Sequence, residues 1–312
     1  MPEIETDVLV IGAGMAGLTA AARAAISGRS VVVVEKSAAI GGSAQFAGYA
    51  WTAPSHDVMD EVNPDGDPAL RRALVDGFSD GIDWIRSLGV DCTDAVTVLR
   101  YGTGHQFDTN RYIDECRRRI RSHGGELHTS AETLSLLTLD SGVVGARVRL
   151  SDGTECEIRW ITGSYVEGAA AIDKFDLAQR RGGRCGIAES LDEFAYLPEE
   201  WGYDGAAIAD QIRALNAAGP DAQPPRRYDS KPLDEGPYYL VEACPALTFP
   251  FHGIRIDEHG RVLDATGGTI SGLFAAGSDT GGLYNRAYTG GIAPALVFGL
   301  AAADFTAPVS TC

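Results

Sequence analysis

The sequence has little cysteine, and what it has is scattered. The six cysteines form no Cys-x-x-Cys pair and no metal-ligand spacing. This pattern excludes a disulfide framework and a zinc ribbon and is typical of reduced thiols. We therefore expect no metal site and a cytoplasmic location. The cysteines are Cys92, Cys116, Cys156, Cys185, Cys244 and Cys312.

Long apolar runs and a secretory leader are also missing. Spanning a bilayer takes roughly 20 consecutive apolar residues, and the sequence contains no such run. An apolar segment begins as early as Val8, with no basic and then apolar leader before it. We therefore expect no membrane span and no secretion signal.

Basic residues are scarce compared with acidic ones. The chain has 43 Asp and Glu against 26 Lys and Arg, a net charge of −17. This balance argues against nucleic acid or an anionic membrane as a partner, and its simplest interpretation is solubility. A hydrophobic content of 45% and a charged content of 22% are typical of a soluble globular protein, and 312 residues allow one large or two ordinary domains.

The richest stretch of the sequence is 8–35. An apolar strand, 8–11, runs into a Gly-Ala-Gly-Met-Ala-Gly turn at 12–17, and a small-residue helix and a second apolar strand, 31–34, follow. The glycines allow a tight turn, close approach of a pyrophosphate and close packing of helix on sheet, while the helix N-terminus attracts phosphate. Glu35 is placed to accept the hydroxyls of an adenosine ribose. This order of elements predicts a dinucleotide site.

The rest of the chain alternates helices and strands. Apolar spacing predicts helices from Asp67 to near Gly89 and from about Thr109 to Gly124, then short alternating strands over 127–160, separated by turn sequences. Further strands are expected at 239–241, 254–257, 262–263 and 273–276, and a last helix at about 291–304. The class is therefore α/β, with a parallel sheet and an antiparallel meander.

Residues 164–230 differ from their surroundings. They are helical in pattern, with a helix expected over 206–217 and a proline-rich linker after it. We interpret them as a small inserted element. The predicted domains are a discontinuous domain at 1–163 and 231–312 and the insert at 164–230.

Three features favour FAD over NAD as the dinucleotide. The cofactor domain is split between the two ends of the chain, Gly41 and Gly42 closely follow Glu35, and an apolar strand ends at Gly277 before polar residues. A helix opening after Gly290 could aim its N-terminus at the pyrimidine end of a flavin and stabilise the reduced anionic ring. A plain NAD(P)-dependent dehydrogenase is the weaker alternative, since no second Gly-x-Gly-x-x-Gly unit follows.

The chain resembles the fumarate reductase/succinate dehydrogenase-type flavoproteins, near 3-ketosteroid Δ1-dehydrogenase and tricarballylate dehydrogenase. The resemblance covers about 1–160 and 166–304 and depends on segments 12–17, 41–51, 237–239, 272–277 and 288–291. It implies a Rossmann-like FAD-binding domain of the glutathione-reductase type, a mobile cap, and transfer of a hydride between flavin N5 and a carbon β to a carbonyl or carboxylate. No His lies between Lys36 and Ala50, so we expect non-covalent FAD.

The residues expected to bind FAD come from both ends of the chain and from the segments between them. They are Gly12, Gly14, Met15, Ala16, Gly17, Glu35, Lys36, Ser37, Gly41, Gly42, Ser43, Ala47, Gly48, Thr133, Thr162, Gly163, Gly277, Ser278, Asp279, Gly291 and Ile292.

One departure from the family concerns the cap. Family members carry a strand ending in Ala-Thr-Gly-Gly and then a much longer cap, whereas here Thr162-Gly163 is followed almost at once by a segment that resembles the far side of a cap. The insert at 164–230 is therefore interpreted as a reduced helical cap remnant. A natural minimal member, an engineered deletion and a missing section would give the same sequence.

The expected catalytic residues are Tyr288 and Arg286. In the family, the position two before the final glycine pair is an acid/base or anchoring group, Arg in fumarate reductases and Tyr in ketosteroid dehydrogenases; here it is Tyr288. Tyr suits a neutral ketone, whereas Arg pairs bidentately with a carboxylate. Packing at the flavin edge is an equally good interpretation of Tyr288, and a structural ion pair is the better one for Arg286.

Tyr49, Trp51 and His252 are the candidate substrate contacts. Tyr49 and Trp51 lie on the loop expected to pass the flavin, where they either line the pocket or pack. For His252 a structural or surface role is favoured, because the local register does not match that of the fumarate reductases. Nothing in the sequence singles out Tyr101, His105 or Arg111.

The leading hypothesis is an FAD-dependent oxidoreductase that desaturates or reduces a carbon–carbon bond beside a carbonyl or carboxyl group of a small molecule. The alternative is an FAD-binding scaffold with little activity, because the cap is short. The substrate, the direction, the electron acceptor and the oligomeric state are not predicted.

Overall fold

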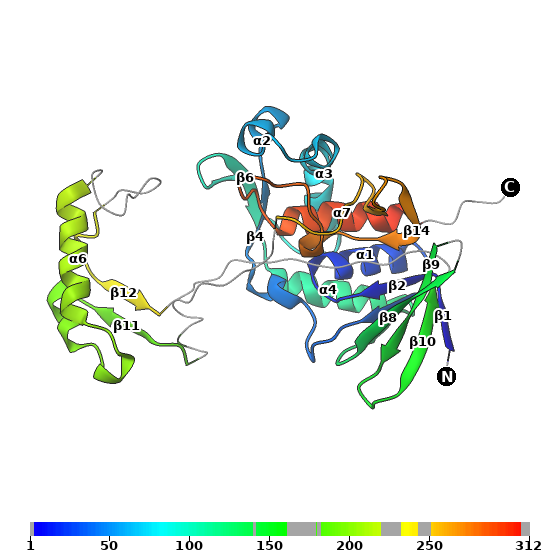
Figure 1. Cartoon of the computed structure of the whole chain (residues 1–312), viewed down its shortest axis with the longest axis horizontal. Coiled ribbons are helices and arrows are strands. Elements are labelled where there is room, and N and C mark those ends of the chain that lie inside the picture. The colour runs from blue at the N-terminus through cyan, green and yellow to red at the C-terminus, as the bar shows by residue number, and fades with distance from the viewer. Residues whose placement is uncertain are drawn as a thin grey trace. The chain divides into compact units, whose positions relative to one another are not determined.

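The structure is a computed structural model that describes residues 3–139, 142–160, 179, 182–219, 232–242 and 251–306. It divides into two compact units, one formed by residues 1–171 with 247–312 and the other by residues 172–246. Figure 1 shows their elements coloured along the chain. Each unit is described by itself below.

The first unit is built on the predicted β-α-β element. Strand β2 (Val8–Ile11) leads into helix α1 (Met15–Ile26), and β3 (Val31–Val34) pairs in parallel with both β2 and β7 (Glu126–His128). Successive valines of β3 enter different cores: Val33 packs with the helices, whereas Val32 and Val34 pack with the meander. Burial on both faces explains why these strands are continuously apolar instead of alternating.

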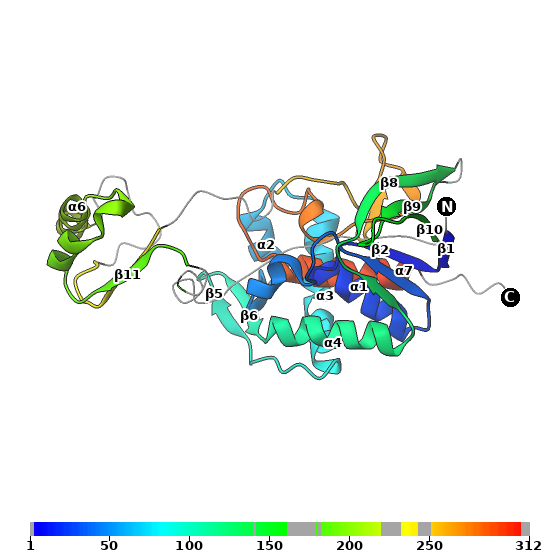
Figure 2. The same cartoon turned by 90° about the horizontal axis from the view of Figure 1, so that it is seen from below.

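Helices cover one face of this sheet. Helix α1 packs against α4 (Thr109–Ser122) and α7 (Ile292–Phe305), and α7 packs against α3 (Pro68–Ser87), as Figures 1 and 2 allow the reader to follow. Small residues allow close contact: a Cβ added at Gly81 of α3 would come within 2.8 Å of Leu296 of α7. The two ends of the chain therefore share one hydrophobic core.

The antiparallel meander covers the other face. It is a sheet in the order β1-β10-β9-β8, in which β1 runs parallel to β10 and the other pairs are antiparallel. Its buried side chains, among them Ala146 and Val148, form a second core with Leu9 of β2. The bounds are β1 (Glu3–Thr6), β8 (Glu132–Leu139), β9 (Gly142–Arg149) and β10 (Glu155–Trp160).

Shorter elements complete the first unit. An antiparallel sheet in the order β4-β6-β5 carries the segment after the glycine loop, and β13 pairs with β14 near the C-terminal helix. These elements are η1 (Gly42–Phe46), β4 (Tyr49–Thr52), α2 (His56–Val62), β5 (Val96–Val98), β6 (Gly102–Gln106), β13 (Arg261–Leu263), β14 (Thr269–Phe274) and η5 (Gly277–Asp279).

The second unit is small and mixed. Strands β11 and β12 pair antiparallel, and α6 packs on η2. Phe194 and Ala209 belong to its small core. Its elements are β11 (Cys185–Ala188), η2 (Leu191–Tyr196), η3 (Glu199–Trp201), α6 (Gly205–Ala218) and β12 (Tyr238–Val241).

Most predicted elements are present, but the sequence did not predict α2, the sheet β4-β6-β5 or strand β11, and two expected strands differ from the expectation. The strand expected at 254–257 is reduced to isolated bridges at Ile254 and Ile256, because these residues pair with different partners, Thr280 and Val262. The strand expected at 239–241 exists as β12, but it pairs with β11 in the second unit, so this unit extends to residue 246 and not to the expected 230.

Candidate functional site

The glycine turn after β2 has the geometry that the sequence predicts. Gly12 has φ 97°, and its N–H donates to the Val34 carbonyl oxygen at 2.8 Å. A Cβ at Gly17 would overlap the carbonyl oxygen of Gly12. Helix α1 can therefore start this close to the strand only with glycine at position 17.

The N-terminus of α1 is buried, and no side chain of the described residues caps it. Gly14 is the N-cap, and Met15 and Ala16 are both 0% exposed. By contrast, the N-termini of α2, α3, α4 and α6 are each capped by a side-chain oxygen. A buried helix start without a cap leaves N–H groups for another acceptor, and an anion suits them. The four capping residues are Ser55, Asp67, Asp108 and Asp204.

Helix α7 repeats this arrangement near the other end of the chain. Its N-cap is Gly291, which has no side-chain cap within the described ranges, and Ile292 and Ala293 are 2% and 0% exposed. The α-helices of the described chain thus fall into two groups, and both uncapped starts carry residues that the sequence assigned to cofactor binding.

Helices α1 and α7 run in the same direction. A Cβ at Gly299 of α7 would lie 3.1 Å from the Ala16 carbonyl oxygen, and further along both helices Arg23 donates to the Asp304 carboxylate at 2.6 and 2.9 Å. Their N-termini therefore face the same side of the first unit, where both partial positive charges act. One extended anionic cofactor could contact both.

Glu35 links the glycine turn to the segment after β3. The Ala13 N–H donates to its Oε2 at 2.8 Å, and the Ser37 N–H donates to its Oε1 at 2.7 Å. The residue is 8% exposed. Each carboxylate oxygen can accept a further hydrogen bond, so Glu35 can still accept the ribose hydroxyls that the sequence predicts for it.

The loop at 41–48 is joined to the same turn. The Gly41 N–H donates to the Ala13 carbonyl oxygen at 2.6 Å, and Gly41 and Gly42 both have positive φ. Further along, the Thr109 hydroxyl donates to the Ala47 carbonyl oxygen at 2.6 Å, and the Phe107 N–H donates to that of Gly48 at 3.1 Å. Half-buried Ser43 follows the two glycines in η1.

The outer positions of the predicted cofactor set are less uniform. Lys36 is exposed and pairs with Glu132 at 3.3 Å. Thr133 of β8 has a buried Oγ1 without a hydrogen-bond partner among the described atoms, which is a free polar atom that a ligand can satisfy. Thr162 and Gly163 lie outside the described residues.

The segment 277–281 lies beside His252. The Ile254 N–H donates to the Asp279 carbonyl oxygen at 2.8 Å, and a Cβ at Gly281 would come within 2.7 Å of the His252 Cα. His252 itself is exposed. Desolvation raises the pKa of the Asp279 carboxyl. Ser278 is half-buried between Gly277 and Asp279 in η5.

Aromatic rings surround Tyr288. The Trp51 ring lies edge-on to those of Tyr288 and Tyr101, with centroids 5.4 and 6.2 Å apart, and the Tyr101 hydroxyl donates to the Tyr288 carbonyl oxygen at 2.6 Å. Tyr288 is half-buried, and desolvation raises the pKa of its phenol, although a hydrogen bond with the Gly291 N–H acts in the opposite direction. The Tyr288 phenol is therefore protonated at neutral pH, the form that can donate a hydrogen bond.

The other predicted substrate and catalytic residues take different positions. Trp51 is only 6% exposed, because glycines on β6 and Gly290 pack against it. Tyr49 is half-buried, and its hydroxyl lies 3.5 Å from Oε1 of Gln106. Arg286 is exposed, on the same loop as Tyr288.

Sequence reasoning missed three residues around Tyr288. The sequence singles out neither Tyr101 nor Tyr284, whose hydroxyl donates to the Gly290 carbonyl oxygen at 2.7 Å. Asn63 accepts three backbone hydrogen bonds from residues 285–287. Its neighbours in sequence are those of an ordinary turn, so no local signal marks it.

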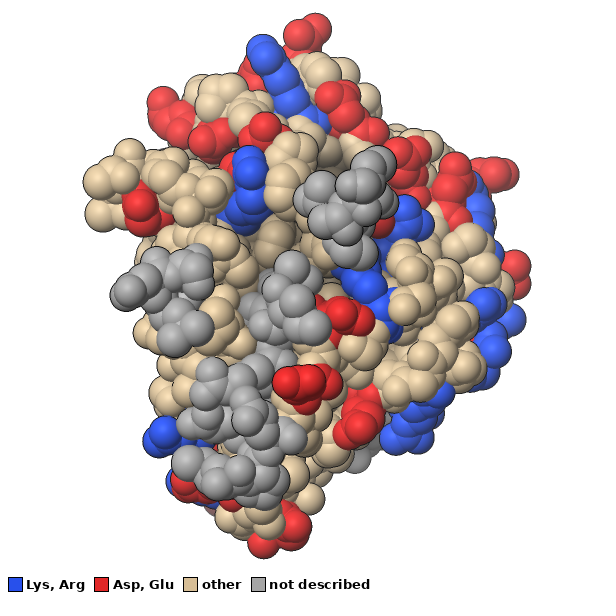
Figure 3. Space-filling model, turned by 90° about the vertical axis from the view of Figure 1, so that its right-hand side faces the viewer, with Lys and Arg blue, Asp and Glu red and all other residues tan. Residues whose placement is uncertain are grey.

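Three observations concern the rest of the described chain. Groups of His, Cys, Asp and Glu that could hold a metal are absent from the described residues. In those ranges, no helix combines the length and apolarity needed to cross a membrane. Acidic and basic side chains are intermingled on the face drawn in Figure 3.

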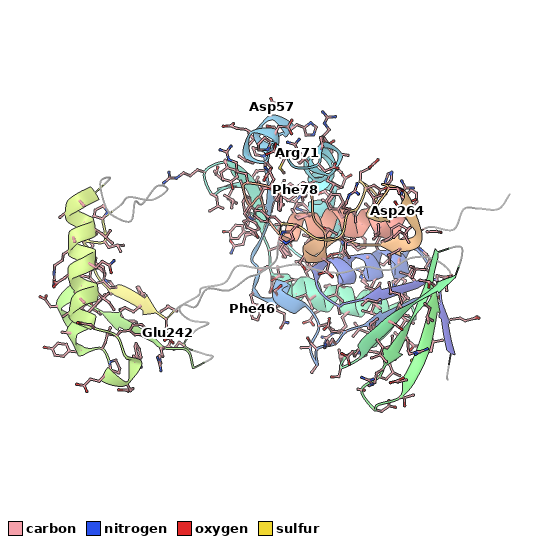
Figure 4. All side chains as sticks on the ribbon, in the orientation of Figure 1. Phe46, Asp57, Arg71, Phe78, Glu242 and Asp264 are labelled. Atoms are coloured by element: carbon pink, nitrogen blue, oxygen red, sulfur yellow. The ribbon has the colours of Figure 1, made fainter. Side chains whose placement is uncertain are left out.

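The second unit has a cavity of its own. It measures about 700 Å³ and is lined by aromatic residues such as Phe194 and Trp201, with Glu242 at its polar part. Glu242, labelled in Figure 4, accepts hydrogen bonds from Tyr203 at 2.7 Å and Arg184 at 3.1 Å. No residue of the predicted cofactor set lines this cavity.

Comparison with known proteins agrees with this geometry. The FAD binding domain family matches residues 7–167 and 169–292. A fumarate reductase (cytochrome) from Shewanella frigidimarina is 23% identical over 453 aligned residues, which cover 99% of this chain and 78% of that protein. Because the alignment is longer than the 312-residue chain, the relative contains segments without a counterpart here.

Solved structures share the fold. A flavocytochrome c3 fumarate reductase in an open conformation has a TM-score of 0.74 at 19% identity, covering 97% of this chain and 78% of that one. A 3-ketosteroid Δ1-dehydrogenase from Sterolibacterium denitrificans has a TM-score of 0.71 at 14% identity, covering 97% of this chain and 99% of that one.

These matches confirm the resemblance, the Rossmann-like α/β class with parallel sheet and antiparallel meander, and FAD in place of the NAD(P) alternative. The family match extends from the first glycine turn to the start of α7. The chain therefore belongs to the FAD binding domain family and is an FAD-binding oxidoreductase.

Proposed function

We propose that this protein reduces an activated carbon–carbon double bond beside a carbonyl group, with non-covalent FAD as its redox cofactor. The observation that carries the proposal is Tyr288, a half-buried phenol with a raised pKa, three residues before Gly291 at the uncapped start of α7. When bound, FAD supplies or accepts a hydride at N5.

The residues proposed to hold FAD are those that meet around the two uncapped helices. The Gly12–Gly17 turn and the N-terminus of α1 would bind the pyrophosphate. Glu35 would accept the ribose hydroxyls, and the partial positive charge at the start of α7 would stabilise the reduced flavin. The buried helix starts and the free Oγ1 of Thr133 fit such a group.

Tyr288 is proposed to donate a proton or a hydrogen bond to the substrate. A phenol whose pKa lies above its ordinary value stays protonated at neutral pH, the form that donates a proton or a hydrogen bond, although the same shift makes it a weaker acid. We propose the reduction direction because it uses the protonated phenol, whereas desaturation would need the deprotonated form as a base for the α-proton.

We propose that the substrate is a neutral ketone and not a carboxylate. Trp51 and Tyr101 pack against Tyr288 and make its surroundings aromatic. Arg286 on this loop could pair with a carboxylate, but it is exposed, and solvent weakens an exposed ion pair. The Shewanella frigidimarina relative is a fumarate reductase, so the experiment below compares an enone with a carboxylate substrate.

A second candidate function is an FAD-binding scaffold with little activity. The observation in its favour is that the fumarate reductase relative contains segments, within the aligned region, that have no counterpart in this chain. A pocket open to water would weaken the electrostatic interactions on which such catalysis depends.

The deciding experiment starts from the visible spectrum and intact mass of the purified protein. We expect flavin bands, and FAD that is released on denaturation, as for a non-covalent cofactor. The reduced protein is then mixed, without oxygen, with a cyclic enone or with fumarate. Rapid reoxidation by the enone supports the proposal, and reoxidation by fumarate alone would assign a carboxylate substrate.

A scaffold gives a different pattern. Its flavin would be reoxidised slowly by air and by neither alkene. A colourless protein that stays colourless with added FAD would contradict both candidates.

A further inference from the structure

Asn63 is a fully buried asparagine at the end of α2, and it is 0% exposed. Its Oδ1 accepts the backbone N–H groups of Asn285, Arg286 and Ala287 at 3.1, 3.2 and 3.0 Å. Three successive N–H groups that converge on one oxygen fix the conformation of that loop much as an anion fixes a backbone nest.

Asn63 is itself held in place by its neighbours. Its carbonyl oxygen accepts from Nη1 of Arg71 at 2.9 Å, and Arg71, only 6% exposed, pairs with Asp60 at 2.7 Å. Arg71 reaches from the start of α3 towards α2 (Figure 4). The Nδ2 of Asn63 lies 3.8 Å from the sulfur of Met59. The hydroxyl of Thr289 lies 3.8 Å from the same sulfur.

Backbone contacts join the same two segments. The Asp67 N–H donates to the Gly282 carbonyl oxygen at 2.7 Å, and a Cβ at Gly66 would overlap the Leu283 carbonyl oxygen. The segment 59–71 thus holds the loop 282–287 along its length, and this loop leads directly into Tyr288 and α7.

We propose that Asn63 is a positioning residue that sets the place of Tyr288 and Arg286 relative to the start of α7. Tyr288 follows directly after the three amides that Asn63 holds, and its carbonyl oxygen is fixed from the other side by Tyr101. The catalytic part of this inference rests on the proposed function, whereas the three amide contacts do not. A small displacement of an oriented donor costs far more in turnover than in binding.

The variant Asn63→Ala removes the acceptor, and Asn63→Asp keeps an oxygen with the same shape. In the aspartate, the three N–H donors and nearby Arg71 favour the ionised carboxylate, so the loop keeps its anchor. The control is Asp65→Ala, which removes an exposed hydrogen bond of 3.0 Å to the Asn285 side chain on the same loop.

Each variant is measured as the FAD-loaded protein in two ways. Amide hydrogen exchange of residues 285–287 reports the contacts directly, and anaerobic reoxidation by the enone gives kcat and KM. For Asn63→Ala we expect faster exchange at these three amides and a kcat lowered by about 100-fold, with a much smaller change in KM. Asn63→Asp and Asp65→Ala should retain slow exchange and most of the turnover.

Two results would overturn the inference: native exchange and kcat in Asn63→Ala, or an Asn63→Asp variant as impaired as Asn63→Ala. If Asn63→Ala does not fold, the aspartate variant decides alone, since it must keep both protection and turnover. If the native protein turns over no alkene, the proposed function fails, and the exchange data still decide whether Asn63 holds the loop.

Discussion

The helices of this protein begin in two different ways. Helices α3 and α4 begin with an aspartate that accepts backbone N–H groups, whereas α1 and α7 begin with a glycine and bury their first residues. A glycine N-cap is only a few tenths of a kcal/mol less favourable than a capping side chain, but a buried helix start whose N–H groups have no acceptor is unfavourable in the protein alone. We therefore propose that N–H groups at the starts of α1 and α7 are available to a ligand, except that of Gly291, which is hydrogen-bonded with the Tyr288 hydroxyl.

The largest expected effect concerns Tyr288, beside one of the uncapped helices. Tyr288→Phe should lower the rate of enone reduction by about 10²–10⁴-fold, the usual contribution of a general acid. Tyr203→Phe is the matched control, because Tyr203 precedes the aspartate-capped α6. Stopped-flow reoxidation of the reduced protein measures both, and equal rates in the two variants would contradict the assignment.

The pH dependence tests the same residue. Because the pKa of Tyr288 is raised above its ordinary value of 10, the phenol stays protonated as the pH rises through neutrality. The rate of enone reduction should therefore not change through ionisation of Tyr288 up to about pH 10, and it should fall only above that pH. A reduction rate that climbs between pH 7 and 9 would contradict the protonated Tyr288 hydroxyl as the donor.

The next effect comes from giving α1 the cap it lacks. Gly14 has extended backbone angles that other residues adopt, φ −88° and ψ −164°. Gly14→Asp should cap the helix but repel the pyrophosphate, which weakens FAD binding by about 100-fold. Gly14→Asn has the same shape without the charge, so the difference in Kd between the two isolates the electrostatic part. Equal Kd values would place the pyrophosphate elsewhere.

A smaller effect is expected at the start of α7. Gly291→Asp would place a negative charge where we propose that the reduced flavin is stabilised, so its midpoint potential should fall by roughly 30 mV, a tenfold change in the two-electron equilibrium. Gly291→Asn serves as the uncharged control. Spectroelectrochemical titration measures both, and an unchanged potential would separate α7 from the flavin.

The smallest effect is expected at a capped helix. Asp108→Ala removes the acceptor of the Arg111 N–H at the start of α4, a hydrogen bond of 2.9 Å. The free energy of unfolding in urea should fall by about 1 kcal/mol, while the affinity for FAD stays unchanged. A loss of FAD affinity in this variant would show that capped helices also support the site. It would contradict the distinction between capped and uncapped helices.

Much of the fold follows from local patterns. The glycine turn, the buried strand at 31–34, and the starts of the helices at Asp67 and Thr109 depend on residues close together in sequence, so they could be predicted. The isolated bridges of Ile254 and Ile256 could not, because their partners lie at different distances along the chain. The same holds for β12, whose partner β11 lies some fifty residues earlier.

The candidate site divides in the same way. The sequence by itself determined that a glycine turn, an acidic residue after the second strand and a glycine before the last helix exist, because each is a local requirement of backbone conformation. Only the tertiary structure decided that α1 and α7 run in the same direction, that Trp51 is buried against Gly290, and that Asn63 holds the loop before Tyr288. These contacts join residues distant in sequence, and their free energy comes from packing and buried hydrogen bonds that no local pattern records.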